Sequence, residues 1–313
     1  MKKTKLLICA VSVMLSGALI LPSCSDDTPE EVENNPQDNE EVEPDTQKPG
    51  GGIMEIPQEV LNKVNEIYGK ASIGPQKVTT VNQLAILTSI CATRSGDGPI
   101  TVTPSTLNGE DVTLVTLGGT EMVEGQATGL EESQLAAFGK SNDYLVALTK
   151  LFTEKIIPQD KPVIVTGISL GGMIAQQVLG QAVVTDNFKI KAIITFGSPI
   201  TLPLDRKGVK VVRFADANDK VPQLGEGLLR SGMVTGSQMS KQELTQKLAD
   251  LDKAEKVSYT SKYTGMIETH ALSYIEDECW AETDFLGDAS KKNVLELKET
   301  MKFYPAPKQV KAE

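Results

Sequence analysis

The stretch "PVIVTGISLGGMIA", residues 162–175, runs from β-branched residues through a glycine-rich turn into a helical pattern. Ser169 lies in that turn, between Gly167 and Gly171. Either the serine is an ordinary turn residue, or the turn exists to present its hydroxyl as a nucleophile. A G-x-S-x-G pattern is weak alone, so the choice depends on what the rest of the chain supplies.

Strand and helix patterns alternate along the chain on both sides of this turn. Apolar, β-branched runs predict buried strands at 111–117, 162–167, 191–196 and 209–214. Helical periodicity predicts helices at 57–69, 81–94, 170–180 and 141–156, the last capped by Ser141. Because apolar strands that alternate with helices form sheets covered on both faces, we expect an α/β fold with a mostly parallel central sheet.

Polar or glycine-rich loops follow four of the expected strands. They are Gly118-Gly119-Thr120, the turn with Ser169, Gly197-Ser198-Pro199, and the loop with Asp216 and Asp219. Open α/β sheets bind their ligands beyond the carboxyl ends of the strands, so these four loops predict one site.

A serine nucleophile needs a base, and the chain contains a single histidine, His270. It comes after the candidate acids Asp216 and Asp219, which gives the order serine, aspartate, histidine. His270 is either this base or a structural residue, and the catalytic role is favoured because of that order. Of the two aspartates, Asp219 is the better acid candidate because Val221-Pro222 follows it closely and would stiffen its loop, whereas Asp216 has no such brace.

Residues 111–275 resemble the class 3 (fungal-type) lipases, which have the α/β-hydrolase fold. The resemblance is carried, in order, by four motifs: "TLGGT", "VTGISLGG", "TFGSP" and "NDKVP". It implies an enzyme that cleaves carboxylic esters without a cofactor, acting on lipids or on acylated glycans. A non-catalytic protein that uses the same fold as a binding or assembly module is the alternative.

The resemblance also implies roles for individual residues. Ser169 would be the nucleophile, Asp219 the acid and His270 the base, and the backbone amides of Thr120 and Leu170 would form the oxyanion hole. The chain departs from the family at two positions. Ile168 replaces the histidine that usually precedes the nucleophile, and Gly119 replaces the arginine that usually precedes the oxyanion threonine. Neither position transfers a proton, so the departures leave the expected catalytic chemistry intact. They argue against membership of a close lipase subgroup.

The N-terminal region reads as an export signal followed by a tether. Residues 1–23 combine lysines with a short apolar run, and "LPSC" at residues 21–24 resembles a bacterial lipobox with Cys24 as the lipidated residue. Residues 24–53 carry ten acidic residues against one lysine, with four prolines, which predicts a disordered tether. "SDD" after Cys24 resembles a surface-export signal of Bacteroides lipoproteins. We therefore expect an outer-membrane lipoprotein exposed at the cell surface.

Residues 54–313 have the length of one hydrolase-like domain. Its share of the total charge of −11 is −5, and it has no basic cluster, which argues against nucleic acid as a partner. With one histidine and no close cysteine pair, a metal site is not expected. Cys91 and Cys279 could form a disulfide or remain free thiols.

Two segments of this domain have open roles. The loop after Thr120, with Met122, Val123 and Leu130, is either a lid over the site or ordinary loop packing. The segment 223–255 is helix-prone and could be an insertion that shapes the acyl site.

Overall fold

A computed structural model describes most of the chain after the tether. The described residues are 56–90, 97–121, 123–230, 239–276, 280, 283–288 and 291–309. The predictions for the export signal, Cys24, the tether, Met122, Cys91 and Cys279 lie outside these residues.

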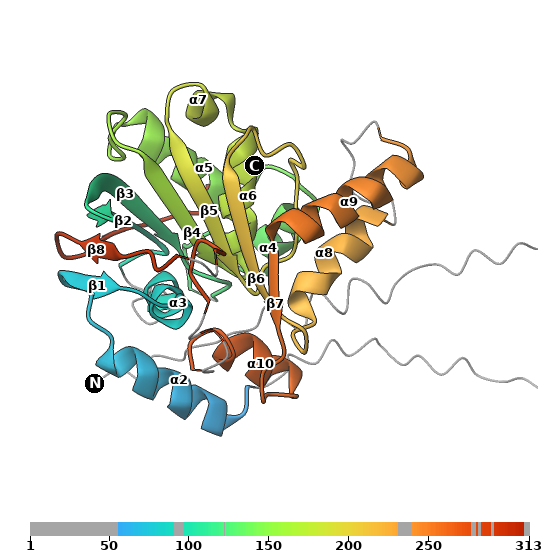
Figure 1. Ribbon diagram of the computed structural model, residues 1–313, viewed down its shortest axis with the longest axis horizontal. Helices are drawn as coiled ribbons and strands as arrows, with labels where there is room; N and C mark the ends of the chain where they lie inside the picture. The colour runs from blue at the N-terminus through green and yellow to red at the C-terminus, as the bar shows by residue number, and fades with distance from the viewer. Residues whose placement is uncertain are drawn as a thin grey trace, which may run out of the picture.

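The described residues form a nine-stranded sheet with helices around it (Figure 1). The strand order is β1-β8-β2-β3-β4-β5-β6-β7, with β9 paired to β2. The strands are β1 Gln76–Val78, β2 Ile100–Leu107, β3 Glu110–Leu117, β4 Val163–Ile168, β5 Ile190–Phe196, β6 Lys210–Asp216, β7 Lys256–Tyr259, β8 Leu295–Leu297 and β9 Lys302–Tyr304.

Strands β3 to β7 lie side by side in sequence order and pair in parallel. They include all four strands predicted from the sequence. The remaining pairs, β1 with β8 and β2 with β3, β8 and β9, are antiparallel. The prediction of a mostly parallel central sheet is therefore confirmed for its main part, and the arrangement is consistent with an α/β-hydrolase fold.

The helices cover both faces of this sheet. They are α2 Gln58–Lys70, α3 Val81–Ser89, α4 Leu130–Ala137, α5 Asp143–Thr153, α6 Leu170–Gln177, α7 Ala182–Thr185, α8 Val221–Arg230, α9 Lys241–Glu255 and α10 Met266–Leu272. The segment predicted to be helix-prone, 223–255, thus contributes most of α8 and the whole of α9. No helix within the described ranges is long and apolar enough to cross a membrane.

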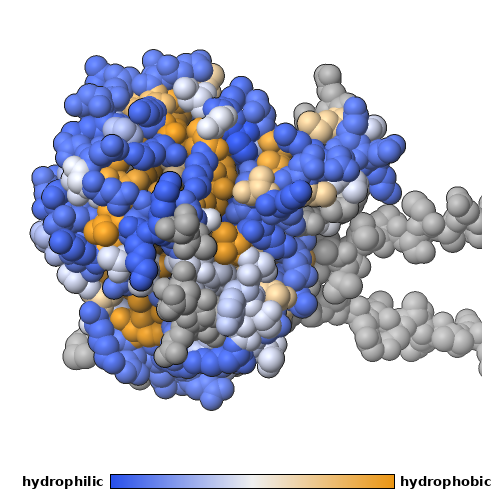
Figure 2. Space-filling model, in the orientation of Figure 1, coloured by the Kyte–Doolittle hydropathy of each residue, from blue (hydrophilic) through white to orange (hydrophobic). Residues whose placement is uncertain are grey.

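The two larger hydrophobic cores lie on opposite faces of the sheet, because neighbouring residues of a strand point to opposite faces. On β3, Leu114 packs in the core with α2, α3 and α10, whereas Val115 packs in the core with α5 and α6. On the face shown in Figure 2, hydrophilic residues cover most of the rim and apolar residues show over the central strands. Both sides of the strands are buried, which explains why the strands read as continuous apolar runs.

The start of α5 differs from its prediction. Asn142, not Ser141, is the N-cap, and its side chain accepts a hydrogen bond from the backbone N–H of Leu145. Asparagine and serine cap helices about equally well, so the choice depends on which residue has extended backbone angles at the helix start. Asn142 has them, with φ −146° and ψ 160°.

Candidate active site

Ser169 occupies a strained turn between β4 and α6. Its backbone angles are φ 52° and ψ −120°, which few residues other than glycine adopt. Its N–H donates to the carbonyl oxygen of Phe196 at 2.9 Å, which fixes the turn against the end of β5. The first helical residue after it is Leu170, so free amides of the helix start lie next to the serine.

The two glycines of the motif are required by close backbone packing. A Cβ atom at Gly167 would lie 2.2 Å from the carbonyl oxygen of Gly171. A Cβ atom at Gly171 would lie 2.3 Å from the carbonyl oxygen of Leu117, at the end of β3. The turn therefore reverses the chain tightly between β4 and α6, so that the start of α6 packs against the end of β3.

His270 and Asp219 form a buried pair. The Nδ1 atom of His270 lies 2.8 Å from Oδ2 of Asp219, and the side chains are 3% and 0% exposed. The other carboxylate oxygen of Asp219 accepts the N–H of Val221 at 3.0 Å. Val221 and Pro222 do not form a separate turn but begin α8, and the start of that helix holds the carboxylate.

The pair and Ser169 meet at the end of β5. A Cβ atom at Gly197 would lie 3.1 Å from Oδ2 of Asp219 and 3.1 Å from Cε1 of His270. Gly197 directly follows Phe196, whose carbonyl oxygen holds the N–H of Ser169. The structure thus gathers the three predicted residues around one strand end.

The hydroxyl of Ser169 is buried and has no hydrogen-bond partner among the described residues, His270 included. Catalytic hydrogen bonds are often long or poorly aligned until a substrate binds. Of the predicted contacts in the triad, the one between acid and base is formed here and the one between base and nucleophile is not.

The predicted oxyanion residues lie beside the serine. A Cβ atom at Gly119 would lie 3.4 Å from Cβ of Ser169, so the loop after β3 passes directly by the serine. Thr120 is buried, and its hydroxyl lies 2.9 Å from the hydroxyl of Ser133 on α4. Ser133 in turn donates to the carbonyl oxygen of Gly129 at 3.0 Å. Thr120 is therefore tied to α4.

Asp216, the competing acid candidate, is bonded to backbone amides rather than to His270. It is buried, and its Oδ1 atom accepts the backbone N–H of Asn218 at 2.9 Å and of Ser261 at 3.3 Å. It thereby connects the loop that carries Asp219 with the segment after β7. No stiff turn like Val221-Pro222 was expected beside Asp216, but these two amides hold its side chain.

Tyr274 is a residue of this site that the sequence did not reveal. Its hydroxyl donates to Oδ2 of Asp219 at 2.9 Å and accepts the N–H of Asp216 at 2.9 Å. Burial, followed by the charge of Asp219, raises the pKa of Tyr274 well above its usual value. The signal that was available is a tyrosine at helical spacing, four residues after the histidine.

Glu121 is a buried carboxyl group directly after Thr120, the predicted oxyanion residue. It is 7% exposed, its Oε1 atom has no partner among the described residues, and burial raises its pKa to about 8. In the loop that follows, Val123 and Leu130 are half-buried.

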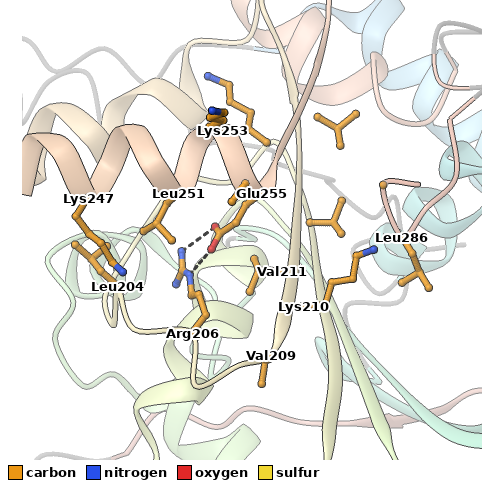
Figure 3. A pocket seen from close by; sticks show the side chains of 15 residues that line it. Leu204, Arg206, Val209, Lys210, Val211, Lys247, Leu251, Lys253, Glu255 and Leu286 are labelled. Carbon is orange, nitrogen blue, oxygen red and sulfur yellow. Dashed lines mark hydrogen bonds and ion pairs between the residues drawn. The ribbon is translucent and has the colours of Figure 1, made fainter. Parts of the chain in front are cut away.

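A cavity of about 550 Å³ lies away from Ser169, at the amino-terminal ends of β6 and β7 (Figure 3). Its walls include Lys247 and Lys253 of α9, and the buried Arg206–Glu255 ion pair, 2.8 Å long. Among the described residues that line it there is no serine, cysteine or histidine. Within the described ranges, no group of three or more potential ligands could hold a metal ion.

Comparison with known proteins adds one distant likeness. No family model matches the chain, and no curated protein matches it. A solved structure that is similar is the Lip2 lipase from Yarrowia lipolytica, at 18% sequence identity and a TM-score of 0.25. The match covers 54% of this chain and 76% of that one.

Proposed function

We propose that the protein is a serine hydrolase of carboxylic esters, similar to the class 3 lipases, with Ser169, His270 and Asp219 as its triad. The observation that carries the proposal is the buried pair of Asp219 and His270, 2.8 Å apart, at the strand end that also fixes the strained Ser169 turn. A buried carboxylate bonded to Nδ1 leaves Nε2 of the imidazole as the atom that can accept a proton.

The reaction would then take two steps. Ser169 Oγ attacks the ester carbonyl while His270 takes its proton, and the amides of Leu170 and Thr120 stabilise the oxyanion. The intermediate collapses to an acyl-enzyme as His270 returns the proton to the leaving alcohol. Water, deprotonated by His270, then releases the acid and restores the hydroxyl of Ser169. No cofactor enters these steps.

A lipid ester or an acylated glycan would be the substrate. We also propose that the enzyme is held at the surface of the outer membrane through Cys24, with residues 24–53 as its tether. A substrate that is attached to a membrane or to a cell-bound polymer would suit such an anchor.

The test is covalent labelling with an alkyl fluorophosphonate. The wild-type protein should be labelled at Ser169, and Ser169→Ala should not be labelled. His270→Ala should lose most labelling because the serine then lacks its base. Hydrolysis of p-nitrophenyl esters of increasing chain length would separate a short-chain esterase from a lipase.

The competing function is a non-catalytic binding module, and the unpartnered hydroxyl of Ser169 favours it. It predicts a folded wild-type protein that the reagent does not label. That result would overturn the proposal.

A further inference from the structure

The acid of the proposed triad is held by three hydrogen bonds. Oδ1 of Asp219 accepts the N–H of Val221, whereas Oδ2 accepts from both His270 and Tyr274. The oxygen of Tyr274 accepts the N–H of Asp216 at 2.9 Å, so the hydroxyl hydrogen is left to be donated to Asp219. His270 and Tyr274 therefore share one carboxylate oxygen.

The ring of Tyr274 is locked in place. A Cβ atom at Gly197 would lie 2.8 Å from ring atom Cε2, so the ring packs directly on this backbone. The ring also stacks with Trp280, at 5.9 Å between centroids and 19° between planes. The carbonyl oxygen of Tyr274 accepts a hydrogen bond from the amide side chain of Asn82 at 3.0 Å. The hydroxyl is therefore held toward Asp219 from three sides.

We propose that Tyr274 is a positioning residue of the acid–base pair: its hydroxyl holds the carboxylate of Asp219 and takes up part of the negative charge that Oδ2 offers to His270. The proposal rests on the proposed function for its importance to catalysis. The coupling between the hydroxyl of Tyr274 and the imidazole of His270 does not depend on which substrate the enzyme uses.

The coupling follows from the chemistry of the shared oxygen. A carboxylate oxygen that accepts an O–H hydrogen bond stabilises a neighbouring imidazolium less than one that accepts none. Tyr274 remains a donor over the working pH range because burial raises the pKa of its hydroxyl. With the hydroxyl removed, the charge of Asp219 acts on His270 alone, and protonated His270 persists to higher pH.

Among the described residues, the charges that act on Tyr274 are those of two aspartates. Asp216 and Asp219 come from the loop after β6, and both act on Tyr274. On the side of α2, Lys63 and Glu276 form an ion pair 2.6 Å long that is bonded to the hydroxyl of Tyr263. Tyr263 is thus a buried tyrosine whose hydroxyl is bonded to charged side chains other than those of the triad. It provides a matched control.

The experiment compares Tyr274→Phe with Tyr263→Phe in the full-length protein. The chain has a single histidine, so one imidazole signal in an NMR titration reports His270, provided that the purification tag contains no histidine. In Tyr274→Phe we expect this titration, and the acid limb of kcat/KM, to move up by roughly one pH unit. We expect kcat to fall by about tenfold with little change in KM. Tyr263→Phe should change neither.

For a second variant we expect the His270 titration to shift in the opposite direction. This variant keeps the test valid if Tyr274→Phe misfolds. Incorporation of 3-fluorotyrosine at position 274 keeps the ring and makes its hydroxyl a stronger donor, so the titration should move to lower pH. The role of Tyr274 would be overturned if the titration were unchanged both in Tyr274→Phe and with 3-fluorotyrosine at position 274. Equal shifts in Tyr274→Phe and Tyr263→Phe would also overturn it. The imidazole signal is readable without turnover, so a wild-type protein that fails fluorophosphonate labelling would refute the proposed function and still test Tyr274.

Discussion

Two aspartates three residues apart have different partners, and this difference can be tested. Asp219 contacts His270, whereas Asp216 contacts backbone amides of its own loop and of the next segment. Asp219→Asn keeps the shape of the side chain but favours the wrong imidazole tautomer, so turnover should fall by about 10⁴-fold. Asp216→Asn keeps an acceptor oxygen for the amides and should cost less than about tenfold.

Both variants should be measured on one activated ester, with folding checked by circular dichroism. A large loss in Asp216→Asn and a small one in Asp219→Asn would show that the acid has been assigned to the wrong residue. The proposed pair of Ser169 and His270 would be unaffected by that result.

Gly197 is the residue on which the site is packed, and its replacement gives a second prediction. It has φ 57°, and a Cβ atom there would meet Tyr274, Asp219 and His270 at 2.8 to 3.1 Å. Gly197→Ala should therefore displace the acid–base pair and lower kcat by at least about 100-fold, as small misplacements of catalytic groups do. Gly109→Ala is the control, because Gly109 also has a positive φ, 85°, but a Cβ atom there would have no neighbouring atom within 4 Å.

The control should lose about 1 kcal/mol of stability from backbone strain and retain its activity. Thermal unfolding of both variants, measured beside their turnover, separates strain from displacement. If Gly197→Ala keeps wild-type kcat, then the site tolerates a methyl group where the structure has no room for one.

At the scale of elements, the parts that were predictable are those built from local sequence. The strand, turn and helix around Ser169 follow from apolar β-branched residues, two glycines and a helical pattern that are adjacent in the chain. The antiparallel strand β2 was not predicted because Pro104 and several hydroxyl residues interrupt its pattern. Proline fits there because β9 pairs with residues 100–102 and β8 with residues 105–107, so that neither strand has Pro104 in its register.

The candidate site was predictable to the same extent. Ser169, Asp219 and His270 each lie in a short motif or are the single residue of their type. The spacing of Tyr274 from His270 was visible in the sequence, but its contacts were not, because its hydroxyl meets Asp216 and Asp219 from 55 to 58 positions away. Contacts at that separation depend on where α10 packs, and no local pattern specifies that.

The loop after β3 gives a prediction about stability and pH. Burial raises the pKa of Glu121 from 4.5 to about 8, so the folded protein keeps this proton over a range where the unfolded chain loses it. Between these values the folded state binds more protons, and its stability therefore falls as pH rises. The penalty from this group should reach a few kcal/mol above pH 8.

Glu121→Gln should remove that part of the pH dependence and raise the melting temperature at pH 8 more than at pH 5. Glu124, an exposed residue of the same loop, provides the control variant Glu124→Gln. Thermal unfolding between pH 5 and pH 8 is the measurement. If Glu121→Gln destabilises the protein equally at all pH values, the buried carboxyl group is not the source of the pH dependence.

At the scale of the whole molecule, the proposed anchor can be separated from the proposed chemistry. Several acyl chains on Cys24 would hold a protein stably on a membrane, whereas one chain alone would be marginal. Cys24→Ala should release a protein that keeps its activity, because the described residues of the site all lie beyond the tether. Fractionation of cells that express each form, followed by ester hydrolysis, is the measurement. A variant that remains with the membrane would refute the lipid anchor.

The packing of Trp280 has an optical consequence for the whole molecule. It is the single tryptophan of the chain, it is buried, and it stacks on the ring of Tyr274 and meets Phe214 edge to face. Its fluorescence therefore originates one ring away from the proposed acid–base pair, with no other indole to obscure it. The emission of Trp280 should therefore change when an inhibitor or a product binds beside it, even in a sample without turnover.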